Sequence, residues 1–418
     1  MAGTTQLGPH ARKPELKALT GLRAVAAIAV VVSHVGVPKS LPKDFADIAH
    51  YGYIGVPLFF MLSGVVLAYN YPELNVRQGR RTIKFYVARI ARVMPLYWVM
   101  IAYCFFFYAA VNHKQFPSAL VQNIFAVQTW GPDLLVAQSY YNGPGWSIGA
   151  ELFFYATFPF LVPVVARIAK RWGPRGLVIV IAAVAALTVA LVVLFTVRGW
   201  ATLPAADPAS AHRWLYRNPL CQLPIFIAGM AIAFLLPHVR HWGSVTHNVI
   251  QTAVPLYVLL LAAFRGEGGF WGAASFGAFF VIPFTLAMLS LGSGRGWLAR
   301  ILSTKPMVTL GVASFALYLT HRWLVWQLSS YDPIVKGHGT DPYFGFILTI
   351  AVLLLVGEGA HRYVEEPARR WIMNLSKKVG RRFPARRQPQ HEAHQVREAH
   401  DGRDAPTEVL ELQQPVAR

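Results

Sequence analysis

The chain has few charged residues and even fewer acidic ones. Asp, Glu, Lys and Arg make up 14% of its 418 residues, and the 39 Lys and Arg outnumber the 19 Asp and Glu. Soluble domains carry about 25% charged residues, so this composition excludes an ordinary soluble protein. Cysteine is also scarce: Cys104 and Cys221 are the only two, and both lie inside apolar runs. They are expected to be buried thiols, which argues against a disulfide-stapled scaffold.

Several common signatures are missing as well. The chain contains no Gly-rich nucleotide fingerprint, no Walker loop and no G-x-S-x-G nucleophile motif. His238, His241 and His247 are too loosely spaced in a loop to predict a metal centre, so no metal site is expected. No small-residue cleavage site follows the first apolar run, and a cleavable signal peptide is therefore not expected.

Long apolar runs dominate the chain instead. Hydrophobic residues make up 55% of it, and the runs reach the roughly 20 residues that a helix needs to cross a bilayer. We therefore predict an all-α, polytopic transmembrane helix bundle of about ten spans, located in the cell membrane. The predicted spans are 18–37, 53–71, 95–112, 146–168, 176–197, 219–236, 248–264, 270–292, 307–329 and 343–363.

The basic residues concentrate in alternate loops between these runs. Such loops mark the cytoplasmic side, which places both termini in the cytoplasm and agrees with an even number of spans. The net charge of +20 is not gathered on one face, so nucleic-acid binding is not predicted. The predicted organisation is a cytoplasmic segment 1–17, a transmembrane domain 18–372 and a disordered basic cytoplasmic tail 373–418.

The first predicted span carries two ionisable residues, Arg23 and His34. Eleven residues make about three helical turns, so both side chains share one face and lie about 16 Å apart along the axis. Ionisable groups are expensive in hydrocarbon and usually mark a functional site. The pair predicts a polar path with a fixed cation near its mouth and a titratable imidazole deeper inside.

A basic cluster precedes the third span and contains Lys84, Arg89 and Arg92. Arg89 and Arg92 are three residues apart, which makes them neighbours on a helix face. The cluster is explained equally well by membrane-surface anchoring or by binding of an anion such as a phosphate, for which arginine is well suited.

Two further spans carry polar residues on one helical face. Trp146, Ser147 and Glu151 follow a Gly-Pro-Gly break, and Glu151 is a carboxylate well inside a span, which favours a functional role over a helix contact. Tyr318 and His321 share a face of the ninth span and are explained either by packing or by lining the cavity of His34. In the last span, Glu358 is a second cavity candidate, whereas Glu365 and Glu366 are expected to cap the helix or pair with nearby arginines.

Together these pieces resemble the integral-membrane acyltransferase family 3, whose members O-acylate sugars, cell-envelope polymers and antibiotics. The resemblance covers residues 15–370 in five ordered motifs, with Phe315 standing where the family has Tyr. The matching residues are Arg23 and His34; Gly55, Phe59, Phe60, Ser63 and Gly64; Phe85, Arg89, Arg92, Pro95 and Tyr97; Trp146, Ser147, Glu151, Phe154 and Tyr155; Ser314, Tyr318, Leu319 and His321.

The resemblance implies an acyl-CoA donor, usually acetyl-CoA, and a hydroxylated acceptor. In that reading His34 is the general base and Glu151 orients the imidazole or stabilises its charged form, and both are assigned as catalytic. A covalent acyl-His34 intermediate remains an open variant. The residues expected to bind donor or acceptor are Arg23, Lys84, Arg89, Arg92, Trp146, Ser147, Tyr318 and His321. No permanently bound cofactor is expected.

The sequence allows alternative acceptors and alternative classes of protein. A short tail in place of a second domain favours a small hydroxylated metabolite, such as a macrolide or its sugar, over a cell-envelope polysaccharide. A transporter of a small polar or anionic solute would also need buried charges and about ten spans. The chain shows no repeated half, however, and a catalytically idle scaffold would leave the buried charges without a reason.

Overall fold

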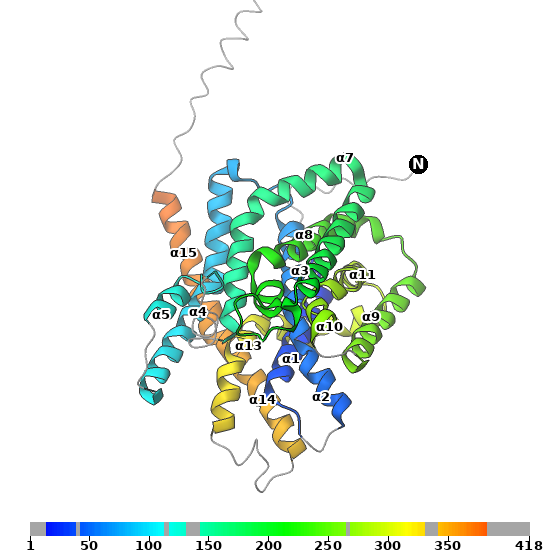
Figure 1. Cartoon of the computed structure of the whole chain (residues 1–418). Helices are drawn as coiled ribbons and strands as arrows, with labels where there is room; N and C mark the ends of the chain where they lie inside the picture. The colour runs from blue at the N-terminus through cyan, green and yellow to red at the C-terminus, as the bar shows by residue number, and fades with distance from the viewer. Residues whose placement is uncertain are drawn as a thin grey trace, which may run out of the picture. The chain divides into compact units, whose positions relative to one another are not determined.

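The computed structural model describes residues 14–38, 42–112, 117–130, 143–264, 268–330 and 342–382, and within them it contains helices and no strand (Figure 1). This confirms the predicted all-α class. The α-helices are α1 (Lys17–Val35), α2 (Lys43–His50), α3 (Gly55–Asn70), α4 (Arg80–Asn112), α5 (Pro117–Ile124), α7 (Trp146–Val197), α8 (Pro219–Leu235), α9 (Ser244–Phe264), α10 (Gly269–Ala274), α11 (Val281–Gly292), α12 (Trp297–Leu302), α13 (Lys305–Ser330), α14 (Pro342–Ala360) and α15 (Glu366–Arg382).

Within the described residues, eight helices are long and apolar enough to cross a membrane, and the chain is a multi-pass membrane protein. The predicted spans differ from these helices in one place. The spans predicted at 146–168 and 176–197 both fall within α7, but the backbone is not helical at Gly173, so α7 consists of two helices that meet at a kink, in agreement with the two predicted spans. The span predicted at 270–292 is broken into α10 and α11, with Ser275–Gly277 and a 3₁₀ turn between them.

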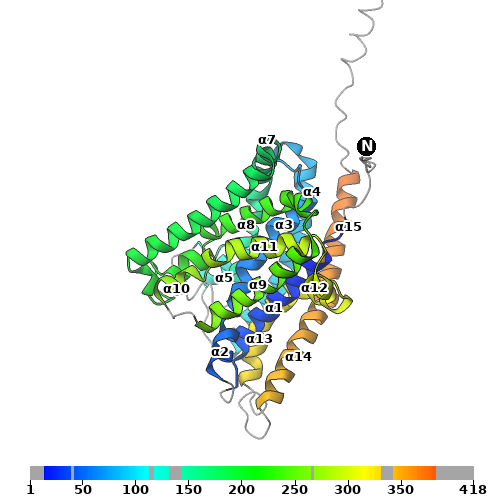
Figure 2. The same ribbon diagram turned by 90° about the vertical axis from the view of Figure 1, so that its right-hand side faces the viewer.

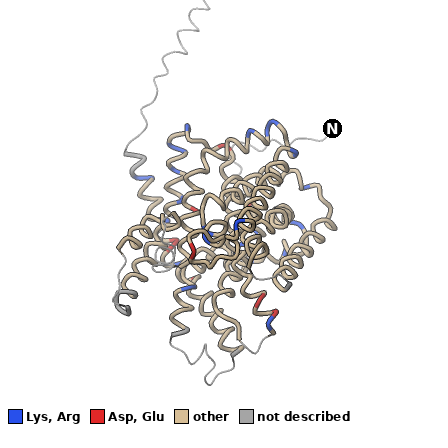
Figure 3. The backbone as a smooth tube through the Cα atoms, in the orientation of Figure 1, with Lys and Arg blue, Asp and Glu red and all other residues tan. Residues whose placement is uncertain are grey.

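Helix α7 bends sharply where its two predicted spans meet. Gly173 has φ 57° and ψ −148° there, and Pro174 follows it. The positive φ suits glycine, and proline removes a helix hydrogen bond, so the two residues together account for the bend. Basic residues gather at this bend and at the start of α4 (Figure 3). That distribution agrees with the alternate basic loops of the sequence.

Close backbone contacts between helices hold the core of the bundle together. Helix α3 packs along α8, α1 packs along α13, and α8, α11 and α9 lie side by side (Figure 2). A Cβ atom on Gly64 would lie 2.2 Å from the carbonyl oxygen of Phe226, and one on Gly229 would lie 2.1 Å from that of Met61. Glycine is therefore required on both sides of the α3–α8 contact, as is usual where transmembrane helices approach closely.

Replacing Gly229 by alanine is expected to destabilise the protein by about 1–3 kcal/mol, because the added methyl group forces α3 and α8 apart. Thermal unfolding of the purified protein in detergent measures the loss as a lower Tm. Gly359→Ala is the matched control, since a Cβ there meets nothing within 4 Å and alanine is the better helix former. An unchanged Tm for Gly229→Ala would contradict the close contact.

The chain divides into two units, residues 1–373 and 374–418. The first unit contains every span predicted from the sequence and every predicted site residue. Of the second unit the structure describes only the end of α15. Most of the predicted tail, from residue 383, and the first 13 residues lie outside the described residues.

Candidate functional site

Three arginines from two helices converge on one small cavity, here called the arginine cavity. Arg23 comes from α1, and Arg89 and Arg92 come from α4. The cavity has a volume of about 80 Å³. Its other polar lining residues are Ser63, Ser147, Glu151, Tyr155, Ser314 and Tyr318. The structure thus brings together basic residues that lie more than sixty positions apart in the sequence.

The arginines have contacts that orient them, but one of their buried donors has no hydrogen-bond acceptor among the described residues. The Arg23 Nε donates a hydrogen bond to the Ser314 Oγ at 3.3 Å. The Arg89 guanidinium lies about 6 Å from the ring centroids of Tyr71 and Phe85, which fixes its plane. Its Nε is buried and has no hydrogen-bond partner among the described residues. A buried donor of this kind is costly unless something else accepts from it, so the residues fit an anionic ligand.

Glu151 lies in the arginine cavity and not beside His34. Its Oε1 accepts hydrogen bonds from Tyr155 and, at 3.5 Å, from Ser63. It is the one carboxylate among the described residues that line this cavity. The predicted pairing of Glu151 with His34 is therefore not what the structure contains. Glu151 and Tyr155 are four residues apart and share one face of α7, but this spacing does not determine which other helix they face.

A second and much larger cavity contains His34. Its volume is about 980 Å³, at the upper end of what drug-sized ligands occupy. It is lined by residues from α1, α2, α3, α7, α10, α13 and the segments between helices. Its principal polar and aromatic lining residues are Ser33, His34, His50, Tyr53, Trp146, His212, Tyr216, Arg217, Phe276, Tyr318, His321, Arg322, Trp323 and Trp326.

His34 pairs with a second histidine, His321, from α13. The His34 Nδ1 lies 2.8 Å from the Val30 carbonyl oxygen and 3.4 Å from the His321 Nε2. A carbonyl only accepts, so the Nδ1 of His34 carries the proton and its Nε2 keeps the lone pair. The Nδ1 of His321 likewise contacts the Tyr318 carbonyl, which leaves its Nε2 as the acceptor facing His34.

Tyr318 and Val56 line both cavities and form the wall between them. The Tyr318 hydroxyl donates to the Pro144 carbonyl at 3.3 Å. Ser147, in the first turn of α7, donates to the same carbonyl at 3.0 Å. Because α7 begins at Trp146, this turn places Trp146 in the large cavity and Ser147 in the arginine cavity.

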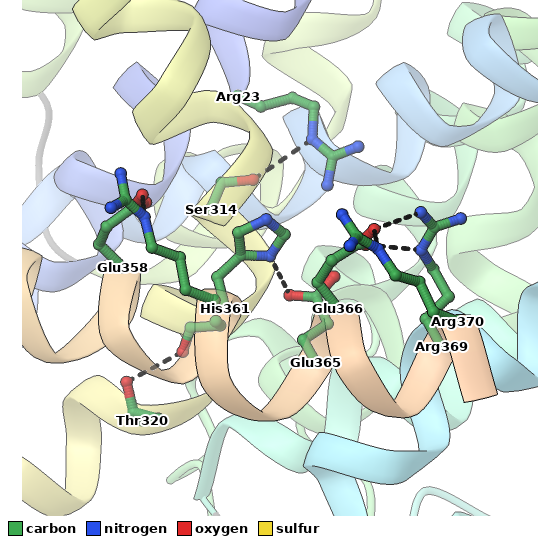
Figure 4. A network of polar contacts seen from close by, with 11 residues as sticks. Arg23, Ser314, Thr320, Glu358, His361, Glu365, Glu366, Arg369 and Arg370 are labelled. Carbon is green, nitrogen blue, oxygen red and sulfur yellow. Dashed lines mark hydrogen bonds and ion pairs between the residues drawn. The ribbon is translucent and has the colours of Figure 1, made fainter. Parts of the chain in front are cut away.

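The polar residues of the last helices line neither cavity. Figure 4 draws them together with Arg23 and Ser314, which do line the arginine cavity. Glu358, a predicted cavity candidate, instead accepts from Arg362 at 2.6 Å. Glu366 pairs with Arg369 and Arg370, which confirms its expected role. Glu365 pairs with His361 at 2.9 Å and not with an arginine. A π-helical turn, His361–Glu365, brings that pair together.

Lys84 is the one predicted donor-binding residue that lines neither cavity, and its side chain is exposed on the first turns of α4. No group of three potential metal ligands occurs in the described ranges. His247 from the rejected histidine cluster contacts Ser290 on α11 instead.

Several cavity residues were missed by the sequence analysis. Arg217 is an isolated charge just before an apolar run, which ordinary loops also carry, whereas Arg322 lies inside the span predicted at 307–329 and its charge was a signal that was overlooked. Tyr216 lies between predicted spans, and Phe276 lies inside the span predicted at 270–292, where an aromatic residue is common. Their convergence depends on how the π-helical turn His212–Arg217 and the break between α10 and α11 pack together.

The chain has detectable relatives of known type. A family described as an acyltransferase domain matches residues 16–357. The O-acetyltransferase OatA of Staphylococcus aureus is 23% identical over 381 residues, which is 85% of this chain and 57% of that protein. The peptidoglycan O-acetyltransferase OatA of Listeria monocytogenes is 24% identical over 84% of this chain and 55% of that protein. The acyltransferase MdmB of Streptomyces mycarofaciens is 25% identical over 90% of this chain and 96% of that protein.

The chain therefore spans a little over half the length of the OatA proteins and nearly all of MdmB. No solved structure matches it. The family match extends over all five motifs that carried the resemblance. The protein belongs to acyltransferase family 3.

Proposed function

We propose that the protein is a membrane-bound O-acyltransferase that moves an acyl group, in the first instance acetyl, from acyl-CoA to a hydroxyl of a small metabolite such as a macrolide or its sugar. One observation supports the proposal. The cavity lined by Arg23, Arg89 and Arg92 and the large cavity that contains His34 share a wall, formed by Tyr318 and Val56. Acyl transfer needs a donor site and an acceptor site that meet at one point.

In this proposal the arginine cavity binds the phosphate end of the donor. Phosphate groups of CoA would neutralise part of the charge of Arg23, Arg89 and Arg92, and the Arg89 Nε would gain an acceptor. The cavity of about 80 Å³ holds only a small group. The cluster therefore receives one end of the donor, and the rest of CoA must lie outside the cavity.

The large cavity supplies the chemistry. The lone pair on the His34 Nε2 removes the proton from the acceptor hydroxyl as its oxygen attacks the thioester carbonyl carbon. The C–S bond then breaks, and the CoA thiolate leaves with its electron pair. The His34 imidazolium returns the proton to the sulfur. The step therefore needs no reactant other than acyl-CoA and the acceptor hydroxyl.

Two residues support this step. The Val30 carbonyl accepts the proton of the His34 Nδ1 and holds the tautomer. The His321 Nε2, 3.4 Å from the same nitrogen, places a lone pair beside the imidazolium that forms and stabilises it, the role first assigned to Glu151. The Tyr318 hydroxyl lies in the shared wall, and by turning away from the Pro144 carbonyl it donates instead to the thioester oxygen on which charge develops.

Two observations bear on the class of acceptor. A cavity of about 980 Å³ fits a molecule of several rings, and the relative matched over nearly its full length is an acyltransferase of Streptomyces. Both favour a small metabolite. Acylation of a cell-envelope glycan is the second candidate, because two OatA relatives are O-acetyltransferases and one is named for peptidoglycan.

Release of free CoA from acetyl-CoA by the purified protein tests the enzymatic proposal against transport. An acyltransferase releases CoA at least slowly, with water or a hydroxyl compound as acceptor, whereas a transporter releases none. Mass spectrometry of metabolites and envelope glycans from a deletion strain then identifies the acceptor by the acetyl mass that is lost.

Arg89→Ala and Arg92→Ala are each expected to raise the apparent KM for acetyl-CoA by about tenfold or more. Each variant removes a charge-assisted hydrogen bond worth about 1.5–3 kcal/mol, and tenfold corresponds to about 1.4 kcal/mol. The measurement is steady-state kinetics with varied acetyl-CoA. Lys84→Ala is the control. Because Lys84 lies outside the cavity, the KM of this variant for acetyl-CoA should change by no more than about twofold. A change confined to the acceptor KM would show that the arginine cavity does not bind the donor.

A further inference from the structure

Touching aromatic rings form one wall of the large cavity. The ring centroids of Trp146 and Tyr216 are 5.0 Å apart, those of Tyr216 and Phe276 are 5.2 Å apart, and those of Tyr53 and Tyr216 are 5.8 Å apart. All four rings line the cavity. Flat apolar surfaces of this kind bind the C–H face of a ring such as a pyranose, while hydroxyl groups on the ring edge stay free for polar contacts.

The cavity also carries positive charge. Arg217 ends the π-helical turn His212–Arg217, and its guanidinium lies 5.7 Å from the Trp146 ring centroid. Arg322 lines the cavity from α13, next to His321. Within the part of the chain that the structure describes, no Asp or Glu lines this cavity. Two guanidinium groups in a cleft without a described carboxylate attract anions and repel cations.

The histidine beside Arg217 does not add to this charge. Burial, together with the nearby Arg217 guanidinium, lowers the pKa of His212 to about 3. His212 is therefore neutral at pH 7 and contributes a ring face, 5.5 Å from the Tyr216 centroid. The permanent charge of the aromatic wall thus resides on Arg217.

We propose that the acceptor is a sugar-containing molecule with an acidic group, a carboxylate or a phosphate, which Arg217 binds while the aromatic wall holds the sugar ring. The proposal rests on the function proposed above and narrows its acceptor. Arginine matches both acids with two parallel hydrogen bonds, and contact with Trp146 fixes the plane of the guanidinium. An acceptor with a protonated amine at this position is disfavoured by like-charge repulsion.

Binding of four matched pyranoses tests this charge selectivity. Glucose, glucosamine, glucuronate and glucose 1-phosphate are titrated into the purified full-length protein by calorimetry, with saturating CoA present to occupy the arginine cavity. We expect glucuronate, glucose 1-phosphate or both to bind at least about tenfold more tightly than glucose, and glucosamine to bind least. Comparison of the two acids shows whether a carboxylate or a phosphate is preferred.

Arg217→Gln is expected to abolish the preference for acids and to leave glucose binding unchanged within about twofold. Arg213→Gln is the matched control, because Arg213 lies on the same π-helical turn but does not line the cavity. Arg217→Lys keeps the charge and should retain part of the preference. If Arg217→Gln does not fold, Arg322→Gln provides the second variant and should reduce the preference by about threefold or more.

The outcomes separate the two proposals. Equal binding of glucose and both acids, preference for glucosamine, no binding of any sugar, or an unchanged preference in Arg217→Gln and Arg322→Gln would each overturn the acidic acceptor. The proposed function would still stand if the wild-type protein released CoA from acetyl-CoA. Absence of CoA release with every acceptor would overturn the proposed function, whatever the sugars bind.

Discussion

Replacing His34 by alanine is expected to lower kcat for acyl transfer by about 10²–10⁴-fold, the usual contribution of a positioned general base. His34 combines a fixed tautomer, an available Nε2 lone pair and a place in the large cavity beside the shared wall. The apparent KM for acetyl-CoA should change little, because the arginine cavity is untouched. Steady-state kinetics of CoA release, with and without acceptor, measure both quantities.

His50→Ala is the control for this result. His50 also lines the large cavity, but its contacts are with Tyr53 and not with His34 or His321. The kcat of His50→Ala should stay within a few-fold of the wild-type value. If His34 and His321 act as a unit, the His34→Ala/His321→Ala double variant should be no worse than His34→Ala alone. More than about a tenth of wild-type kcat in His34→Ala would rule out a general base at this position.

The membrane architecture could be predicted because it depends on local composition. A run of about 20 apolar residues forms a spanning helix whatever its neighbours are. The kink at Gly173 lies between the spans predicted at 146–168 and 176–197 and agrees with them. The one difference arose where a break depends on geometry. The Gly-rich stretch after Phe270 broke a span that hydrophobicity alone had joined.

The site could be predicted only in part. Helical spacing placed Arg89 beside Arg92 and Tyr318 beside His321, because neighbours on one helix face follow from 3.6 residues per turn. Which helices face one another depends on the packing of distant segments, and this cannot be predicted from the spacing of residues along one helix. His34 therefore faces His321, and not Glu151 as predicted, because α1 packs along α13. Arg217 was missed for the same reason, since its turn lies far from every motif in the sequence.

Removing the charge of Glu151 is expected to cost about 3 kcal/mol of stability in the absence of donor, near the lower end of the range for an uncompensated buried charge. Glu151→Gln keeps the oxygen that accepts from Tyr155 and Ser63. It leaves Arg23, Arg89 and Arg92 around one cavity with no carboxylate among its described lining residues. The carboxylate makes no direct ion pair with these arginines in the described structure, so its effect acts through the field of the whole cavity.

A bound anion should replace the missing charge. CoA is therefore expected to raise the Tm of Glu151→Gln by more than it raises the Tm of the wild-type protein, because ligand binding stabilises the folded state by mass action. Glu358→Gln is the control: its pair with Arg362 is partly exposed and lies outside both cavities, so the change in stability should stay below about 1 kcal/mol. Thermal unfolding with and without CoA distinguishes this role from the predicted pairing with His34. A wild-type Tm and CoA response, combined with a large loss of kcat, would show that Glu151 acts on the imidazole after all.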